Sequence, residues 1–183
     1  MGVTAMPPDV VASATAAGKA YLRLVGDDEL GVLAGCARAA LALAEAFCGQ
    51  VLVRRVVEDV VGTGGAWQAL SAAPVASIAG LTGLPVAGAP FVLAVDGYAV
   101  DIDAQGVGWV RVLRSAGVAR VAVNYAAGLA ADWSGLPEPI AQGVAMLTAH
   151  LFEKRVETSA PPAAVAALWR PYRRIRFAME QRT

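Results

Sequence analysis

An amphipathic helix in the last third of the chain is its clearest pattern. From Pro137 to Val156, apolar residues recur at three- and four-residue steps, which places them on one side of a helix. These residues are Ile140, Val144, Leu147, Leu151 and Phe152. Gln142, Glu153 and Arg155 are left to face water. We interpret the apolar side as core or as subunit interface, and expect the other elements to pack around this helix and the short strand at 121–125 that precedes it.

Two further helices are expected at the N-terminal end. The first is predicted over 11–24. The second begins after Asp27 and Asp28, whose carboxylates can cap it, and ends near Gly49. Alanines step by three and four along one side of this second helix, so it can approach a neighbour closely. A short fourth helix is predicted over 163–169.

The middle of the chain is predicted to form short β-strands. Over 51–61, valines interrupted by charged residues suggest one long strand or two joined by a bulge. The further candidates are Trp67–Leu70, Ser77–Leu81, Phe91–Val95, Tyr98–Ile102 and Trp109–Val112. Asp96 and Gly97 lie between two of these runs. They predict a type I′ hairpin, because both central residues of that turn need a positive φ. The expected order is therefore helix, helix, strands, long helix, short helix.

Composition favours a subunit of a larger assembly. Hydrophobic residues make up 57% and charged residues 16% of the 183 positions, against usual values of about 45–50% and 25%. Too little charged surface is available to cover an isolated monomer, although a base-composition bias of the source genome explains the excess of Ala, Val and Gly equally well. Net charge is zero, but arginines crowd the C-terminus at Arg170, Arg173, Arg174, Arg176 and Arg182.

The same patterns argue against secretion and membrane insertion. The chain does not open with a basic, apolar and small-residue leader. Residues 60–95 contain no charged residue, but Gly and Pro interrupt them too often for a membrane helix. Cys36 and Cys48 are about 18 Å apart on one predicted helix, which is too far for a disulfide. We expect a soluble protein of a reducing compartment with no membrane partner.

Patterns for catalysis or metal binding are sparse. His150 is the one histidine, and we interpret it as a packing or interface residue, with a metal ligand or general base as the alternative. Asp101 and Asp103 share one side of a strand and could bind a cation, but the outer side of a hairpin is the commoner explanation. The glycines at 62–65 lack the Lys-Ser/Thr ending of a phosphate loop. The prediction is therefore no catalytic residue, no metal and no cofactor, hence no enzyme.

The C-terminal segment gives the sharpest signal. It interleaves arginines with aromatic and apolar residues: Trp169, Arg170, Tyr172, Arg173, Arg174, Ile175, Arg176 and Phe177. These residue types are enriched at interface hot spots, and arginines also suit phosphate contacts. Docking into a protein partner is the preferred interpretation. A solvated terminus and direct nucleic-acid binding are the alternatives.

Three stretches, in this order and spacing, carry a family resemblance. The first is 17–52, with Ala17-Gly18-Lys19-Ala20-Tyr21 before an Ala-rich helix; the second is Pro74-Val75-Ala76-Ser77-Ile78. The third joins Val123-Asn124-Tyr125 to Leu136-Pro137-Glu138-Pro139 and to the helix ending His150-Leu151-Phe152. With these stretches the chain resembles the head–tail connector, or adaptor, proteins of long-tailed phages and of phage-derived gene transfer agents.

This resemblance implies an α+β fold: a helical bundle of about four helices with an inserted small antiparallel β-region and an extended basic C-terminal tail. It implies a single connector domain with paired helices (10–49), the β-region (50–125), C-terminal helices (137–169) and the tail (170–183). Such proteins form a homo-oligomeric ring, usually a dodecamer, in a virion or virus-like particle. The implied partners are the portal, the stopper or tail-completion protein, and DNA that passes without sequence specificity. The alternative function is a small nucleic-acid-binding or regulatory module acting through the Arg-rich tail.

Overall fold

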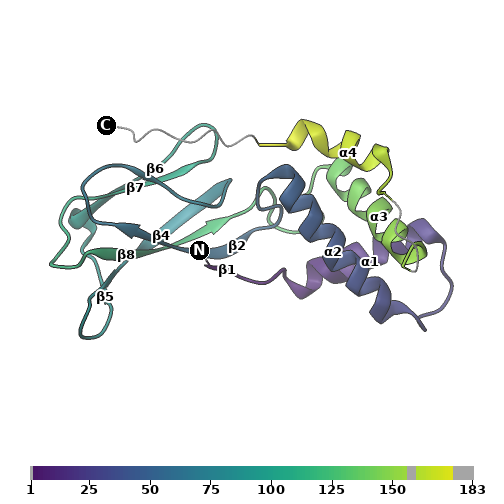
Figure 1. Cartoon of the computed structure of the whole chain (residues 1–183), viewed down its shortest axis with the longest axis horizontal. Coiled ribbons are helices and arrows are strands. Elements are labelled where there is room, and N and C mark those ends of the chain that lie inside the picture. The colour runs from purple at the N-terminus through teal and green to yellow at the C-terminus, as the bar shows by residue number, and fades with distance from the viewer. Residues whose placement is uncertain (1, 156–159, 175–183) are drawn as a thin grey trace. The chain divides into compact units, whose positions relative to one another are not determined.

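The computed structural model describes residues 2–155 and 160–174, which form two compact units (Figure 1). The helical unit consists of Met6–Val53 and the described residues from Ala130 onward. The β unit consists of Arg54–Leu129 and the residues before Met6. The described residues hold four α-helices and two antiparallel sheets, which confirms the predicted α+β class. The bundle arrangement and the single connector domain stay predictions.

Helix α3 is the centre of the helical unit. The helices are α1 (Pro8–Leu22), α2 (Leu30–Cys48), α3 (Glu138–Glu153) and α4 (Ala163–Trp169). Helix α3 packs against the other three, and α1 also packs against α2. Gly18 of α1 lies so close to α3 that an added Cβ would be 2.6 Å from Cγ2 of Thr148. A residue that weakens a helix in isolation therefore permits close helix packing here.

The two ends of α2 differ in how well the sequence predicts them. Gly49 ends the helix in the left-handed region at φ 65°, as expected, and its N–H donates to the carbonyl of Glu45. The predicted cap at Asp27 and Asp28 is wrong. Glu29 occupies the N-cap position and makes no side-chain cap bond. The Asp27 carboxylate instead pairs with the Lys19 ammonium at 2.6 Å.

The β unit is built from two antiparallel sheets. Strands β1 (Gly2–Val3), β2 (Arg55–Gly62), β8 (Arg120–Ala127), β4 (Val75–Leu84) and β5 (Phe91–Val92) form the larger sheet in that order. Strands β3 (Gln68–Ala69), β7 (Gly108–Val112) and β6 (Tyr98–Ile102) form the smaller one. Both sheets bury apolar side chains, including Val57, Leu81, Val121, Val123, Trp109, Val110 and Val112.

The hairpin predicted at Asp96 and Gly97 is wrong. Strand β5 pairs with β4, and β6 pairs with β7, so the two runs that flank this dipeptide belong to different sheets. Residues Val95–Gly97 form a 3-10 turn between them. The dipeptide does lie in a turn, as its sequence indicates. The two strands that flank it, however, pair with other strands and not with each other.

A buried polar network fixes the loop before β4 to the larger sheet. The Tyr125 hydroxyl donates to Oδ2 of Asp59 at 2.8 Å and accepts the N–H of Ala72 at 3.0 Å. The hydroxyl and N–H of Ser71 both donate to the same carboxylate at 2.6 Å. Burial raises the pKa of Tyr125 to about 12. The phenol therefore stays protonated and holds the loop at neutral pH.

Candidate functional site

The C-terminal segment identified from sequence is described as far as Arg174. It comprises α4, the 3-10 turn Arg170–Tyr172 and the two residues that follow. Ile175, Arg176 and Phe177 lie outside the described residues. The described part belongs entirely to the helical unit.

Trp169 anchors the segment to α3. Its side chain is 3% exposed, and the indole Nε1–H donates to the carbonyl of Ile140 at 3.2 Å. Gly143, one turn further along α3, makes room for the ring: an added Cβ would be 2.2 Å from Nε1 of Trp169. The Phe47 ring lies 5.9 Å from the Trp169 ring, tilted by 55°. The indole is thus a core residue of the monomer.

The residues after Trp169 are hydrogen-bonded to the C-terminal end of α2. Gln50 donates through Nε2 to the Tyr172 carbonyl at 2.8 Å, and the Arg174 N–H donates to the Cys48 carbonyl at 2.8 Å. Gly49 lies directly beneath, where an added Cβ would be 2.9 Å from the Arg174 carbonyl oxygen. The segment is therefore held in place over Tyr172–Arg174 and is not a freely solvated tail there.

This attachment sets the position of the arginines. Arg170 and Arg173 are exposed, and the Arg173 guanidinium carbon lies 5.9 Å from the Phe47 ring centre. The C-terminal end of α2 carries no basic residue in its own last turn, so the arginines complement the negative end of its dipole. The result is an ordered basic surface suited to an acidic protein partner or to phosphate.

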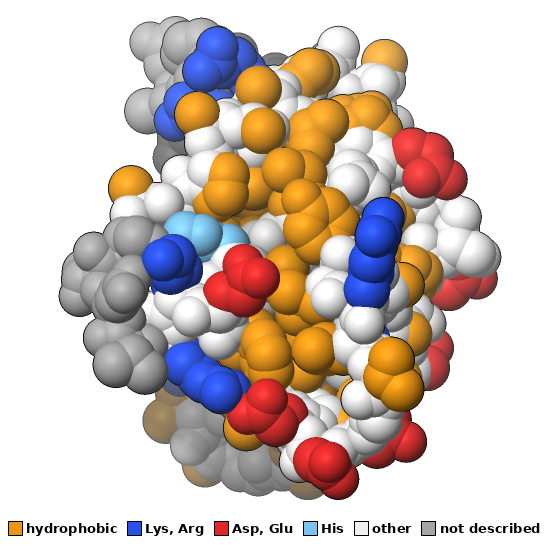
Figure 2. All heavy atoms as spheres, turned by 90° about the vertical axis from the view of Figure 1, so that its right-hand side faces the viewer, with side chains coloured by type: hydrophobic (Ala, Val, Ile, Leu, Met, Phe, Trp, Pro, Cys, Tyr) orange, Lys and Arg blue, Asp and Glu red, His pale blue; other side chains and the backbone are white. Residues whose placement is uncertain are grey.

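An apolar groove adjoins the arginines. It has a volume of about 460 Å³ and is lined by residues of α2, α3, α4 and the turn before α4. The lining residues are Leu43, Ala46, Phe47, Leu147, Pro161, Pro162, Ala163, Val165, Ala166 and Trp169. Figure 2, which looks onto the helical unit, shows hydrophobic side chains gathered in a band between charged ones. The helical unit thus leaves apolar surface uncovered next to a basic segment.

The apolar side of α3 forms core within the monomer. Ile140, Val144, Leu147 and Phe152 are buried, while Leu151 is half-buried. The remaining predicted positions, Gln142, Glu153 and Arg155, are exposed as expected. Of the two roles left open for this side of the helix, the structure places four of its five residues in the core.

The other candidate residues do not gather into a chemical site. His150 is half-buried on α3. Asp103 accepts hydrogen bonds from the N–H groups of Gln105 and Val107 and from the Trp109 indole, so it organises the β6–β7 turn. Cys48 is buried, and burial raises the pKa of its thiol to about 11. Among residues 2–155 and 160–174, no group of three His, Cys, Asp or Glu could hold a metal ion.

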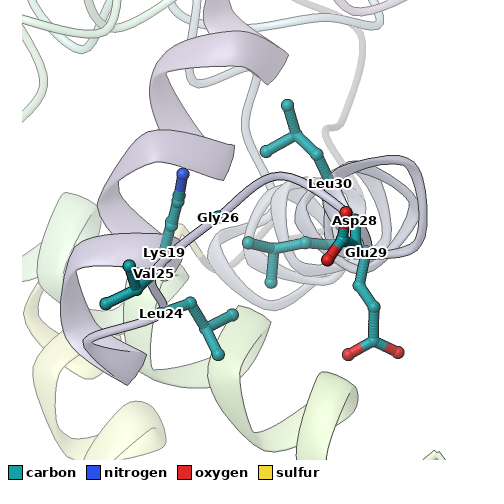
Figure 3. A pocket seen from close by; sticks show the side chains of 8 residues that line it. Lys19, Leu24, Val25, Gly26, Asp28, Glu29 and Leu30 are labelled. Carbon is teal, nitrogen blue, oxygen red and sulfur yellow. The ribbon is translucent and has the colours of Figure 1, made fainter.

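A smaller pocket of about 200 Å³ lies at the connection between α1 and α2. Figure 3 shows Lys19 reaching it from α1, and Leu24, Val25, Asp28 and Glu29 on the segment that connects α1 to α2. The Lys19 ammonium is paired with Asp27. The pocket is therefore lined by both charged and apolar side chains.

Helix α2 is the element of the described chain that is long and apolar enough, by length and composition alone, to cross a membrane. Helices of soluble cores pass the same test. Of its most apolar 18-residue window, 28% is buried in the monomer.

Comparison with known proteins places this fold among structural chains of particle necks. The sequence matches no protein-family model and no curated protein. Among solved structures, a chain from the "neck of empty GTA particle computed with C6 symmetry" is 26% identical, with a TM-score of 0.78 and full coverage of both chains. A chain from the "virion of native gene transfer agent (GTA) particle" is 27% identical, with a TM-score of 0.74 and 97% coverage of both chains.

A third chain, from the "neck of native GTA particle computed with C12 symmetry", is 27% identical, with a TM-score of 0.71 and full coverage of both chains. The neighbours are structural components of particles. These comparisons support the predicted localisation in a virion or virus-like particle, and they support a structural head–tail role and an oligomeric ring.

Proposed function

We propose that this chain is a non-enzymatic adaptor subunit that forms a ring between the portal and the stopper or tail, lines part of the DNA exit channel and joins head to tail. One observation carries the proposal: both units together, over the full length, resemble neck chains of gene transfer agent particles. A likeness confined to one unit would show only a shared module. Because the likeness covers both, the whole chain fits a neck position.

The C-terminal segment is the proposed portal-binding surface. Arg170, Tyr172, Arg173 and Arg174 are held on the end of α2, so little conformational entropy is lost when a partner binds them. The proposal also includes Ile175, Arg176 and Phe177, which lie outside the described residues. Trp169 acts indirectly, because its buried indole fixes the segment on α3.

The β unit is the proposed contact to the next ring. The β4–β5 hairpin exposes apolar side chains: Val86 in its loop is fully exposed, and Phe91 and Val92 of β5 are 38% and 79% exposed. Exposed apolar residues on a projecting loop are typical of surfaces that become buried in an assembly. DNA passing through the channel needs no base-specific contact in this proposal.

Deletion of the coding sequence, followed by electron microscopy of the particles, tests the function. We expect filled or empty heads without attached tails, and rescue by the intact chain. Cryo-electron microscopy of rescued particles should show a ring of this chain beneath the portal. Normal tailed particles without the chain would refute the proposal.

Direct DNA binding by the arginine segment is the competing function, favoured by three arginines within five described residues. Binding to phosphates weakens steeply with salt, because condensed counterions are released. Binding of the purified chain to duplex DNA at about 50 and 200 mM salt distinguishes the two. The adaptor proposal expects weak binding with a shallow slope, and binding to the portal that persists at the higher salt concentration.

A further inference from the structure

Helix α2 carries an exposed stripe of uncharged residues that no described residue of the helical unit covers. Val32, Ala39, Leu43 and Ala46 follow one another by seven, four and three residues and therefore share one side of the helix. All four are exposed, and Val32 and Leu43 are each 48% exposed. The charged residues of α2, Arg38 and Glu45, fall outside this stripe.

The stripe continues into the apolar groove. Leu43 and Ala46 belong to both, and across the groove α4 and the turn before it present Pro161, Pro162 and Ala166. None of the groove-lining residues is charged. We refer to the stripe and the groove together as the α2–α4 surface. It is uncovered in the monomer and uncharged, which is typical of surfaces that are buried in obligate assemblies.

A second groove, which we call the α1–α2 groove, lies on the opposite side of α2. It has a volume of about 400 Å³ and is lined by α1 residues, including Pro8, Ala12 and Ala16, and by Leu30 and Ala34 of α2. Ala34 is nine residues before Leu43, two and a half helical turns away, so the two residues point to opposite sides of the helix. The helical unit therefore has two apolar surfaces facing in different directions.

Cyclic symmetry requires two different surfaces of this kind. In a ring, each subunit binds its neighbour head to tail, so one surface contacts a different surface of the next copy. With C12 symmetry, as in one of the similar necks, successive subunits are rotated by only one twelfth of a turn. The two contacting surfaces of one subunit must then lie on nearly opposite sides, which is the arrangement about α2.

We propose that the α2–α4 surface binds the α1–α2 groove of the next copy of this chain. This inference rests on the proposed ring function and assigns the subunit interface of the ring to α2. The apolar side of α3 is already buried in the core of the monomer. Charge permits the contact, because the stripe is uncharged and the α1–α2 groove carries a single charged residue, Lys19. The covering molecule is another copy of the chain.

Photo-crosslinking in assembled particles tests the interface. A benzophenone amino acid is placed at Leu43 or at Val32, and at Val25 as control, since Val25 is fully exposed on the α1–α2 loop outside both surfaces. Irradiation should produce an adduct of twice the 18.7 kDa chain mass from the first two positions and not from the third. Mass spectrometry should map the second peptide to α1 or the start of α2.

The outcomes separate this inference from the ring function. An adduct with a different protein or with lipid, or no adduct at all, would overturn the α2 assignment in particles that contain the chain. Absence of the chain from purified particles would overturn the ring function itself. As a second readout, Leu43→Arg should lower incorporation into particles roughly tenfold or more, because it buries an unpaired charge, whereas Val25→Arg should not. Equal incorporation of both variants would also refute the assignment.

Discussion

Substitution of Gly143 by alanine tests whether Trp169 packs where the structure places it. In an open helix position, Gly→Ala stabilises by about 0.5–1 kcal/mol. At Gly143 the new Cβ would be 2.2 Å from the indole nitrogen. The ring is buried and hydrogen-bonded, so it cannot move aside freely. Overpacking costs about 1–3 kcal/mol, and this exceeds the gain in helix propensity.

The expected result is therefore a net loss of about 1–2 kcal/mol in the free energy of unfolding. Gly35→Ala in α2 is the matched control, because nothing lies within 4 Å of its added Cβ. Denaturant unfolding followed by circular dichroism at 222 nm reports on the helices of the unit. The control should gain stability, so the two variants should differ by about 2 kcal/mol.

A double-mutant cycle makes the test specific. In a Trp169→Phe background the ring is smaller and lacks the indole nitrogen, so Gly143→Ala should cost at least about 1 kcal/mol less than in the natural sequence. If Gly143→Ala stabilises the chain as much as Gly35→Ala does, or if its cost is the same in both backgrounds, the packing of Trp169 on α3 is refuted.

Three other predictions concern the β unit and the arginine segment. Tyr125→Phe leaves the buried Asp59 carboxylate without one donor and should cost about 1–3 kcal/mol in denaturant unfolding. Because the pKa of Tyr125 is about 12 in the folded chain and near 10 in the unfolded one, its contribution to stability is complete below about pH 10. It should then fall by about 2–3 kcal/mol as the pH rises to about 12. Arg173→Glu should reduce head–tail joining with little loss of stability, since its side chain is exposed.

The pH dependence and the arginine substitution each have a matched control. The loss between pH 10 and 12 should be smaller in Tyr125→Phe, and an equal loss in both proteins would contradict the assignment to this phenol. Arg38→Glu is the control for Arg173→Glu, because Arg38 is exposed on α2 away from the C-terminal segment. If Arg38→Glu impairs joining as much as Arg173→Glu does, net charge is responsible and the segment has no special role.

Local signals in the sequence predicted elements well where neighbours in the chain decide the structure. The strand at Tyr98–Ile102 and the helix at Ala163–Trp169 have the predicted bounds, and Gly49 ends its helix as expected. Each depends on side-chain alternation, on a flanking proline or on a residue that tolerates positive φ. These determinants lie within a few residues of the element itself.

Features that depend on contacts between residues far apart in the sequence could not be predicted from such local signals. No local pattern shows that β5 pairs with β4 and β6 with β7. The arginine-rich segment was found from its composition, but its attachment to α2 depends on the partners of Gln50 and Cys48, both more than 100 residues earlier. The exposed side of α2 was not predicted for a similar reason. The sequence shows that the helix is rich in alanine, but it does not show which of these residues are buried in the monomer.

The connections between the two units suggest which segment of this chain can be exchanged by recombination. Two of the chain's connections between the units lie side by side: the Ala130 N–H donates to the Leu52 carbonyl at 3.0 Å, and Val53 bridges Ala130. A third connection lies at Ala5 and Met6, because the N-terminal strand β1 also belongs to the β unit. Residues 54–129 therefore leave and re-enter the helical unit at neighbouring positions. If the β unit contacts the next ring, as proposed, exchange of this segment together with the N-terminal strand for those of a relative would change the specificity for the next component, while α1–α4 stay unaltered. Natural recombination has the same opportunity.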